Sequence, residues 1–486
     1  METEKRGSVR YQGAPPGYFE RRGLRRYAGV GSLWALGVGA VISGDFFGWN
    51  FGLAAGGFGG LLVATVVITA LYVGLCFSVA EMSAALPHTG GAYSFARSSM
   101  GPWGAYVTGL AENMEYILTP AVIVVGIGGY LGAIFETPDA WAPLWWLCTY
   151  ALFVGLNSTG VEVTFRFTVA ITLVALAILG VFFVGALAHF DLPTHGPVPD
   201  ANGIPSWFPN GWEGVFAALP FAIWFYLAIE QLPLAAEEAR APQRDLPRGL
   251  LLGLATLVVT AFATLVLSSG IAPGAAALGQ SDEPLFDGFR TILGDGVGAR
   301  VLAGLAVAGL VASFHSIVFA YGRQIYSLSR AGYFPRWLSL THPVRRTPQR
   351  ALLVGGALGY AVALAIHSTG PDHPVGAVLL NMAVFGAVIS YALQMLSFLL
   401  LRWRLPEMER PYRSPLGVPG ALLALLISGV TLVALFASDP IYQRVVAAAA
   451  VWYLLGLLWF ACVGRHQLLR SPEEAFALEA RQGADD

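Results

Sequence analysis

A single carboxylate stands in the middle of the first long apolar segment of this chain. Residues 42–50 read ISGDFFGWN, and the acid, Asp45, lies between Gly44 and Gly48. A charged side chain at the centre of a bilayer costs roughly 2.5 to 3.5 kcal/mol on insertion scales, so it is kept there for a function. Glycines allow the helix to unwind, and unwound backbone at that depth must be buried in protein or line a cavity. We therefore expect a small-cation site here, with Asp45 as the counter-ion of an ammonium group.

A structural interpretation of Asp45 also stays open, in which the carboxylate caps an unwound half-helix or pairs with a hydroxyl group. Both interpretations place Asp45 in the site. Three further acids lie in apolar segments: Glu112 and Glu115 stand three apart, hence on one helix face, and Glu230 lies in the stretch LPFAIWFYLAIEQLP. We rank Glu115 second to Asp45, whereas Glu112 could equally satisfy a backbone break.

Aromatic residues surround both candidate breaks. Phe46 follows Asp45, and Trp224 and Phe225 precede Glu230. A desolvated ammonium over a ring face gains about 0.5 to 2 kcal/mol, so these rings suit a small amine. Ser43 or a backbone group would take the hydroxyl of such a substrate.

The elements that position these residues are membrane-spanning helices. Of the 486 residues, 56% are hydrophobic and 12% charged, with a mean hydropathy of +0.63, which is typical of an all-α polytopic membrane protein. Apolar runs long enough to cross about 30 Å of hydrocarbon predict twelve helices. The expected spans are 28–54, 57–83, 103–135, 143–160, 164–189, 213–236, 248–271, 299–327, 350–367, 374–401, 417–437 and 444–464.

Five helices separate the two candidate breaks, which predicts a five-plus-five inverted repeat with unwound helices one and six. No sequence identity between the halves supports the repeat, so it rests on this layout. The expected parts are an N-terminal tail (1–27), a first repeat (28–189), a second repeat (213–401), two added helices (417–464) and a C-terminal tail (465–486). The acidic tail is expected to be a solvated helix or disordered.

Charge placement predicts the orientation of the chain. Of the 28 Lys and Arg residues, all but Arg290, Arg300 and Arg444 fall in the tails, in loops on the side of the N-terminus or at the helix ends next to those loops. By the positive-inside rule we expect both termini to lie on the cytoplasmic side. We expect the protein itself to lie in the plasma (cell inner) membrane. The juxtamembrane Arg clusters are therefore topological, and we expect no nucleic-acid partner. The three cysteines have unrelated spacings, so no disulfide, metal site or cofactor is expected.

Four stretches resemble the amino acid, polyamine and organocation (APC) transporter superfamily. They are the helix-one break and three segments at 80–97 (AEMSAALPHTGGAYSFAR), 228–249 (AIEQLPLAAEEARAPQRDLPRG) and 321–351 (YGRQIYSLSRAGYFPRWLSLTHPVRRTPQRA). The likeness covers nearly all of residues 25–465. The runs ISGDFFGWNFGL, LPHTGGAYSFARSSMGPWG and GLAENMEYILTPAVIVVGIGGYLG look like those of bacterial ethanolamine permeases.

The resemblance implies a LeuT-like fold, substrate bound between helices one, three, six and eight, and alternating access. It implies that Trp224 is the aromatic gate that closes over substrate and that Glu115 faces the pocket. Glu230 matches an acid that more often braces the helix-six break than touches substrate. Ser313 and Ser316 lie near where sodium-binding relatives place hydroxyls.

The chain departs from the superfamily in one place. Amino acid carriers place a Gly, small residue, Gly triplet in helix one, where N–H groups hold the substrate carboxylate; here the triplet is Ser43, Gly44, Asp45. Two ionised carboxylates 4 Å apart repel by about 4 kcal/mol at an effective dielectric of 20. We therefore predict import of ethanolamine or a similar small primary amine, with an amino acid permease as the alternative. No nucleophile or metal motif indicates an enzyme.

The co-transported ion stays open at this point. Some proton-coupled members of the superfamily use a Lys in helix five, but the only lysine in this chain is Lys5, which excludes that mechanism. A proton on Glu115, sodium near Ser313 and Ser316, or the membrane potential alone could drive uptake. The potential favours entry of a monovalent cation by about 2.3 kcal/mol per 100 mV.

Overall fold

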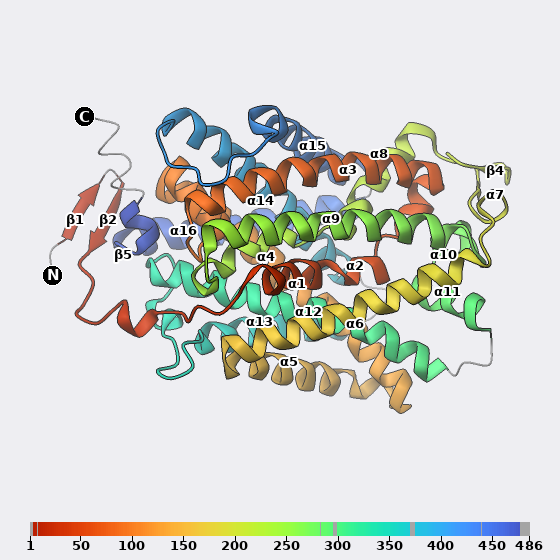
Figure 1. Ribbon diagram of the computed structural model, residues 1–486, viewed down its shortest axis with the longest axis horizontal. Coiled ribbons are helices and arrows are strands. Elements are labelled where there is room, and N and C mark those ends of the chain that lie inside the picture. Colours follow the sequence, from red (N-terminus) through yellow and green to blue (C-terminus); the bar gives the residue numbers. More distant parts are fainter. Residues whose placement is uncertain are drawn as a thin grey trace.

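Long helices run along the length of the molecule, and both chain ends emerge at the same end of the bundle, called the termini end below (Figure 1). The structure is a computed structural model that describes residues 3–6, 8–281, 283–294, 299–369, 375–438 and 440–476. Among these residues, ten helices are long and apolar enough to cross a membrane. The broken first helix and α5 (Ala142–Thr159) bring the number to the predicted twelve.

The first helix is broken, as predicted. α1 (Val30–Val41) and α2 (Ser43–Phe46) are followed by a turn at residues 47–50, where Phe47 is extended and Gly48 has a φ of 95°. The helix resumes at the start of α3 (Phe51–Ala85), which bends sharply at Gly57 to become the second helix. Asp45 thus lies in the last turn before the break rather than inside it.

The sixth helix is also broken, as predicted. α8 (Gly211–Ala222) and the short 3-10 helix η3 (Ile223–Phe225) are separated by residues 226–228 from a second 3-10 helix, η4 (Ile229–Glu238). Ala228 takes a φ of 78°, which is unusual for a residue other than glycine. Glu230 therefore begins the half-helix on the termini side of the break.

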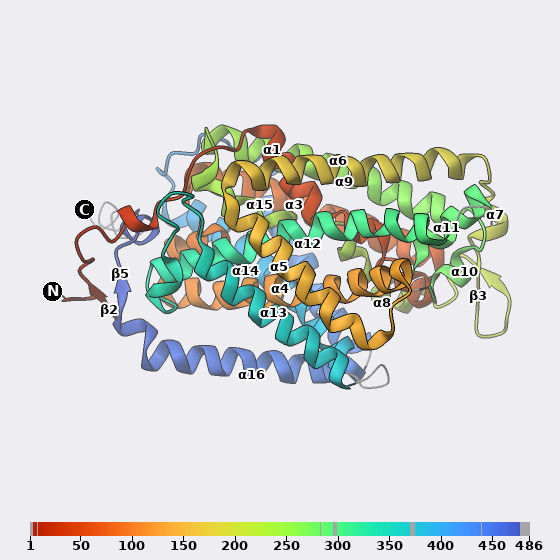
Figure 2. The same ribbon diagram turned by 90° about the horizontal axis from the view of Figure 1, so that it is seen from below.

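The other long helices surround these two. α4 (Gly91–Phe135) packs against α12 (Ala299–Arg330) and α14 (Val375–Arg404), and α1 packs against α6 (Val161–Leu187), α9 (Pro242–Ser269) and α12. α16 lies along one edge of the bundle (Figure 2). The remaining elements are α13 (Gln349–Thr369), α15 (Gly417–Ser438), α16 (Pro440–Cys462), the short helices α7 (Leu192–His195), α10 (Ala275–Leu278) and α11 (Pro284–Leu293), the 3-10 turns η1 (Glu20–Arg22), η2 (Asp139–Trp141), η5 (Arg336–Ser339) and η6 (Gly464–His466), and the strand pair β3 (Val198–Pro199) and β4 (Pro205–Ser206).

The broken helices are joined to each other at the termini end. The carbonyl of Glu238 accepts hydrogen bonds from the N–H groups of Tyr27 (2.7 Å) and Ala28 (2.9 Å), and the Arg240 N–H donates to the Ala28 carbonyl (2.8 Å). The Glu238 carboxylate forms two hydrogen bonds to Arg323 of α12, at 2.9 and 3.1 Å, and both side chains are fully buried. The start of helix one and the end of helix six are therefore one connected unit.

The two tails pair with each other. β1 (Thr3–Arg6) and β2 (Val9–Gln12) form an antiparallel hairpin, and β5 (Leu468–Leu469) joins β2 in parallel. The expectation of a solvated or disordered C-terminal tail is wrong for its first part, because Glu473 and Glu474 are fully buried. The rest of the tail, residues 477–486, lies outside the described residues.

Candidate functional site

The helical turns just before the two breaks touch at Gly44 and Trp224. A Cβ at position 44 would lie 2.6 Å from the carbonyl carbon of Trp224 and overlap its oxygen, so only glycine permits this approach. Gly48 lies under the indole of the same residue, where a Cβ would come within 3.1 Å of the ring. The breaks therefore fit together through backbone contact.

The Asp45 carboxylate points toward α9. Thr260 donates to Oδ2 at 2.9 Å and Thr264 donates to Oδ1 at 3.0 Å, and Asp45 is only 1% exposed. These threonines stand one helical turn apart, so one face of α9 holds both oxygens. This arrangement matches the structural interpretation of Asp45, in which its carboxylate pairs with hydroxyl groups.

The N–H groups around the first break have acceptors within the protein. The Ser43 N–H donates to Oγ of Ser313 (3.0 Å), the Asp45 N–H to the Ile42 carbonyl (3.1 Å) and the Phe47 N–H to the Ser43 carbonyl (3.1 Å). The Gly48 N–H donates to Oδ1 of Asn50 at 3.1 Å. These are groups that could otherwise hold a substrate carboxylate, and each is already satisfied.

An aromatic cavity of about 40 Å³ lies between the breaks. Such a volume holds no more than a few water molecules, so substrate requires it to widen. The rings of Phe47 and Trp224 are 5.9 Å apart beside it. The lining residues are Phe47, Gly48, Phe51, Pro220, Phe221, Trp224, Asn381 and Val384.

Of the aromatic residues predicted for the site, Trp224 lines the cavity. Phe46 instead packs against α12, where its ring would meet a Cβ at Gly309 within 2.6 Å. Phe225 stacks on Trp49 with ring centres 5.5 Å apart. Phe221 and Asn381 line the cavity but were not predicted from the sequence, because Phe221 is further from Glu230 than the aromatic residues chosen and Asn381 lies in an unbroken helix.

Glu112 braces the start of α4. Its Oε2 accepts from Nε2 of Gln324 at 2.7 Å, and its carboxylate also accepts from the main chain at Ala92 and Tyr93. Those two residues follow the loop between the second and third helices. Glu112 therefore acts on the backbone, which was one of its two predicted roles.

Glu115 and Glu230 form a buried carboxyl pair. The two groups lie within hydrogen-bonding reach of each other, and among the described residues no hydroxyl or amide donor reaches either oxygen of Glu115. Tyr116 approaches Glu230 at 3.4 Å, and Tyr391 contacts it from α14. Two ionised carboxylates repel each other strongly in a dry interior, so a proton shared between these two groups would stabilise the pair.

Hydroxyl groups cluster where α1 meets α12. Ser313 donates to the Gly39 carbonyl at 3.0 Å, and Thr172 of α6 donates to the Ala35 carbonyl at 3.1 Å. The Ser316 hydroxyl is buried and has no hydrogen-bond partner among the described residues. A Cβ at Gly39 would lie 3.0 Å from it, so Ser316 faces helix one. Both serines thus face the first helix, and their predicted role near a sodium ion stays a prediction.

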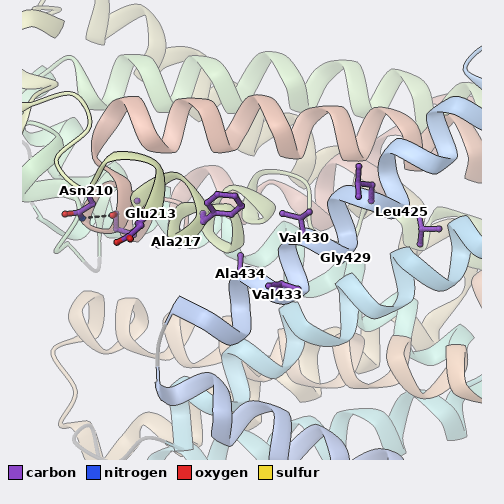
Figure 3. Close-up of a pocket in the computed structure, with 12 residues that line it drawn as sticks. Asn210, Glu213, Ala217, Leu425, Gly429, Val430, Val433 and Ala434 are labelled. Atoms are coloured by element: carbon purple, nitrogen blue, oxygen red, sulfur yellow. Dashed lines mark hydrogen bonds between the residues drawn. The ribbon is translucent and has the colours of Figure 1, made fainter.

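A much larger groove, about 1130 Å³, opens on the outer surface between α8 and α15. Figure 3 shows its apolar wall from Leu425 to Ala434 and its polar end at Asn210 and Glu213. Asn210 donates to the Ala55 carbonyl at 2.8 Å. None of the predicted site residues lines this groove, and its outer walls, such as Val433 (67% exposed), lie on the apolar surface of the bundle.

The model of the amino acid permease family matches residues 29–462. The chain belongs to the amino acid permease family. This permease is 31% identical over 451 residues to an uncharacterized transporter of Rhizobium meliloti, covering 91% of the chain and 92% of the relative. Two Bacillus subtilis proteins, a methylthioribose transporter (24% identical) and a branched-chain amino acid permease (25%), each match over 92% of the chain and 95% of their own length.

Solved structures agree on the fold. A mutant of the manganese transporter of Eremococcus coleocola superimposes with a TM-score of 0.53 at 15% identity, covering 96% of this chain and 99% of that one. The predicted LeuT-like architecture, with unwound helices one and six, is therefore confirmed. The permease is a multi-pass membrane transporter, not an enzyme.

Proposed function

We propose that this permease imports ethanolamine or a similar small primary amine across the plasma membrane by alternating access. The observation that carries the proposal is the state of the first break, where the N–H groups of Ser43, Asp45, Phe47 and Gly48 are already bonded within the protein. A zwitterionic amino acid would find few donors there for its carboxylate. A substrate with an ammonium and no carboxylate needs none.

The buried charge supports the same substrate class. Asp45, Glu112, Glu115 and Glu230 lie at 3% exposure or less near the two breaks, and within the described residues none of them pairs with a Lys or Arg. Four carboxyl groups without a basic partner favour a positively charged guest. The aromatic cavity between the breaks, whose lining residues include none of these four acids, offers ring faces over which an ammonium is stabilised.

In this proposal Asp45 remains the counter-ion of the ammonium. Its carboxylate is one residue from the Gly44–Trp224 contact, so parting the breaks would let substrate reach it. The ammonium would then replace one threonine hydroxyl, of Thr260 or Thr264, as a donor to Asp45, and the other threonine would hold the carboxylate in place. Trp224 is the gate, because it closes the cavity and its backbone touches Gly44.

We assign the co-transported ion to a proton on the Glu115–Glu230 pair. A pair that shares one proton needs only local rearrangement to gain or lose another when the half-helix that carries Glu230 moves. Sodium at Ser313 and Ser316 is the competing assignment, supported by the free Ser316 hydroxyl. The termini end faces the cytoplasm in this proposal, as the placement of Lys and Arg predicts.

Flux into liposomes tests substrate and coupling together. Purified protein is reconstituted, and radiolabelled ethanolamine uptake is followed under a proton gradient, a sodium gradient or a voltage, each imposed alone. We expect saturable uptake that the proton gradient drives and that unlabelled leucine or lysine does not inhibit. The names of some relatives favour the alternative, an amino acid permease; preference for zwitterionic amino acids would establish it and overturn the amine proposal.

A further inference from the structure

The C-terminal tail is inserted among the helix ends at the termini end. Leu469 donates through its N–H to the carbonyl of Ala331 at 2.9 Å, and residues 472–476 form a helical turn. Gly332 takes a φ of 91° and leaves no room for a Cβ against the carbonyl of Gln467. The ring of Phe476 lies 6.1 Å from that of His88. The tail is thus packed into the bundle as far as the described residues extend.

Glu473 binds the end of α12. Its carboxylate accepts hydrogen bonds from Arg330 and, at 3.1 Å, from the Ser327 hydroxyl. Burial alone would raise the pKa of Glu473, but the charge of Arg330 and nearby hydrogen-bond donors outweigh it and bring the pKa to about 2. Glu473 therefore stays ionised throughout the physiological pH range, and a change of pH there does not detach it.

Glu474 binds the start of α4. Its carboxylate accepts hydrogen bonds from Arg97 at 2.5 Å and from the hydroxyls of Tyr11 and Tyr333, both at 2.7 Å. Arg97 also donates to the Tyr11 hydroxyl at 2.6 Å, so the N-terminal strand joins the same cluster. All of these side chains are buried, and the Arg97–Glu474 pair is shielded from solvent.

Arg330, the partner of Glu473, also binds the broken sixth helix. Arg330 donates to both oxygens of Glu237, the penultimate residue of η4, at 2.6 and 2.8 Å. Thr89, just before α4, exchanges hydrogen bonds with Glu237 as well. Arg330 would keep Glu237 as its partner if Glu473 left, so departure of the tail does not strand that charge. Docking of the tail is therefore suited to reversal.

We propose that residues 468–476 are an autoinhibitory lock, which must leave the cleft between α4, η4 and α12 before the termini end of the transport path can open. The inference rests on the proposed function only in assigning that end to the cytoplasm. Alternating access requires these helix ends to separate, and a segment that bonds to two of them and reaches the third through Arg330 opposes separation.

The test uses the buried thiol of Cys76, which lies near the Glu230 carboxyl group at the break of the sixth helix. Cys76 of α3 is fully buried, and Cys148 and Cys462 are replaced by Ser so that it is the only cysteine. Its labelling by a membrane-impermeant cationic reagent is measured in inside-out vesicles for the full chain, for a chain ending at Arg470 and for the double variant Glu473→Gln/Glu474→Gln. We expect both altered proteins to label roughly tenfold faster, the scale of a typical coupling between sites.

Two controls make the result specific. Glu407→Gln/Glu409→Gln removes two exposed charges from a loop at the same end and should label like the parent. A synthetic peptide of residues 467–486, added to the chain ending at Arg470, should slow labelling again, while the same peptide with both glutamates changed to glutamine should not. Parent-like labelling in the folded double variant would overturn the lock, whatever substrate the permease carries. If the shortened chain misfolds, the full-length double variant decides.

Discussion

Gly44 of the first helix lies directly against the main-chain carbonyl of Trp224 of the sixth, so that the two interruptions share one backbone contact. Substrate held near Asp45 must pass this contact or sit beside it. The position of Trp224 is therefore set by the backbone of helix one as much as by its own neighbours.

Replacing Gly44 with alanine should abolish transport. The added Cβ would overlap the Trp224 carbonyl and force the breaks apart, at a cost of roughly 1 to 3 kcal/mol or more. We expect uptake to fall at least about tenfold and the thermal unfolding midpoint to drop. Gly180→Ala in α6, where a Cβ meets nothing within 4 Å, is the matched control. Normal uptake by Gly44→Ala would mean that the contact opens freely.

Asp45→Asn should reduce kcat/KM for ethanolamine by about 10- to 100-fold, the loss expected when a hydrogen bond to a charged group is removed. Asparagine keeps the size of the side chain and can still contact Thr260 and Thr264, so the fold should be preserved. The double change Thr260→Val/Thr264→Val, which leaves the charge but frees its oxygens, should mainly alter KM. Initial rates over a range of ethanolamine concentrations separate the two, and unchanged uptake by Asp45→Asn would refute its role as counter-ion.

Glu115→Gln should uncouple uptake from the proton gradient. Glutamine can donate to Glu230 without carrying the shared proton, so exchange of labelled for unlabelled ethanolamine should persist while proton-driven accumulation is lost. Glu162→Gln, which removes an exposed acid paired with Arg166, provides the comparison. Accumulation that still follows the proton gradient in Glu115→Gln would move the coupling to another group, with Ser316 and sodium the next to be examined.

Trp224→Phe should retain most transport, whereas Trp224→Ala should raise KM by about fivefold, since an aromatic face over an ammonium contributes on the order of 1 kcal/mol. The alanine variant also removes the ring that covers Gly48, which should let the cavity admit larger amines. Competition by amines of increasing length measures this change. Identical selectivity in the alanine variant would show that another residue forms the gate.

The helix breaks could be predicted from the sequence because glycine, proline and a buried acid each leave a local signature. The chain leaves regular helix at Gly48, as that residue predicts, whereas Pro220 lies inside α8 and the sixth helix breaks further along, at residues 226–228. The number of long helices follows equally from apolar length. The exact position of the first break, at residues 47–50, could not be predicted, because the acid was expected to lie inside the unwound turn.

The partners of the acids were harder to foresee. Asp45 meets Thr260 and Thr264, which are more than 200 positions away along the chain, although two threonines one turn apart in an apolar helix are a usable signal. Glu473 and Glu474 read locally as part of a polar, acidic tail. Their burial depends on Arg330 and Arg97, and composition alone gives no indication of such distant pairing.

The main-chain hydrogen bonds between Glu238 and residues 27–28 restrict how the two broken helices can move. The start of the first helix is hydrogen-bonded to the end of the sixth. Neither helix can therefore move outward alone without breaking buried main-chain hydrogen bonds. The inner halves of both helices should therefore tilt as a rigid pair, pivoting where each chain unwinds. Substitutions that weaken these hydrogen bonds at residues 27 or 28, far from the substrate, should then change the rate of the whole transport cycle.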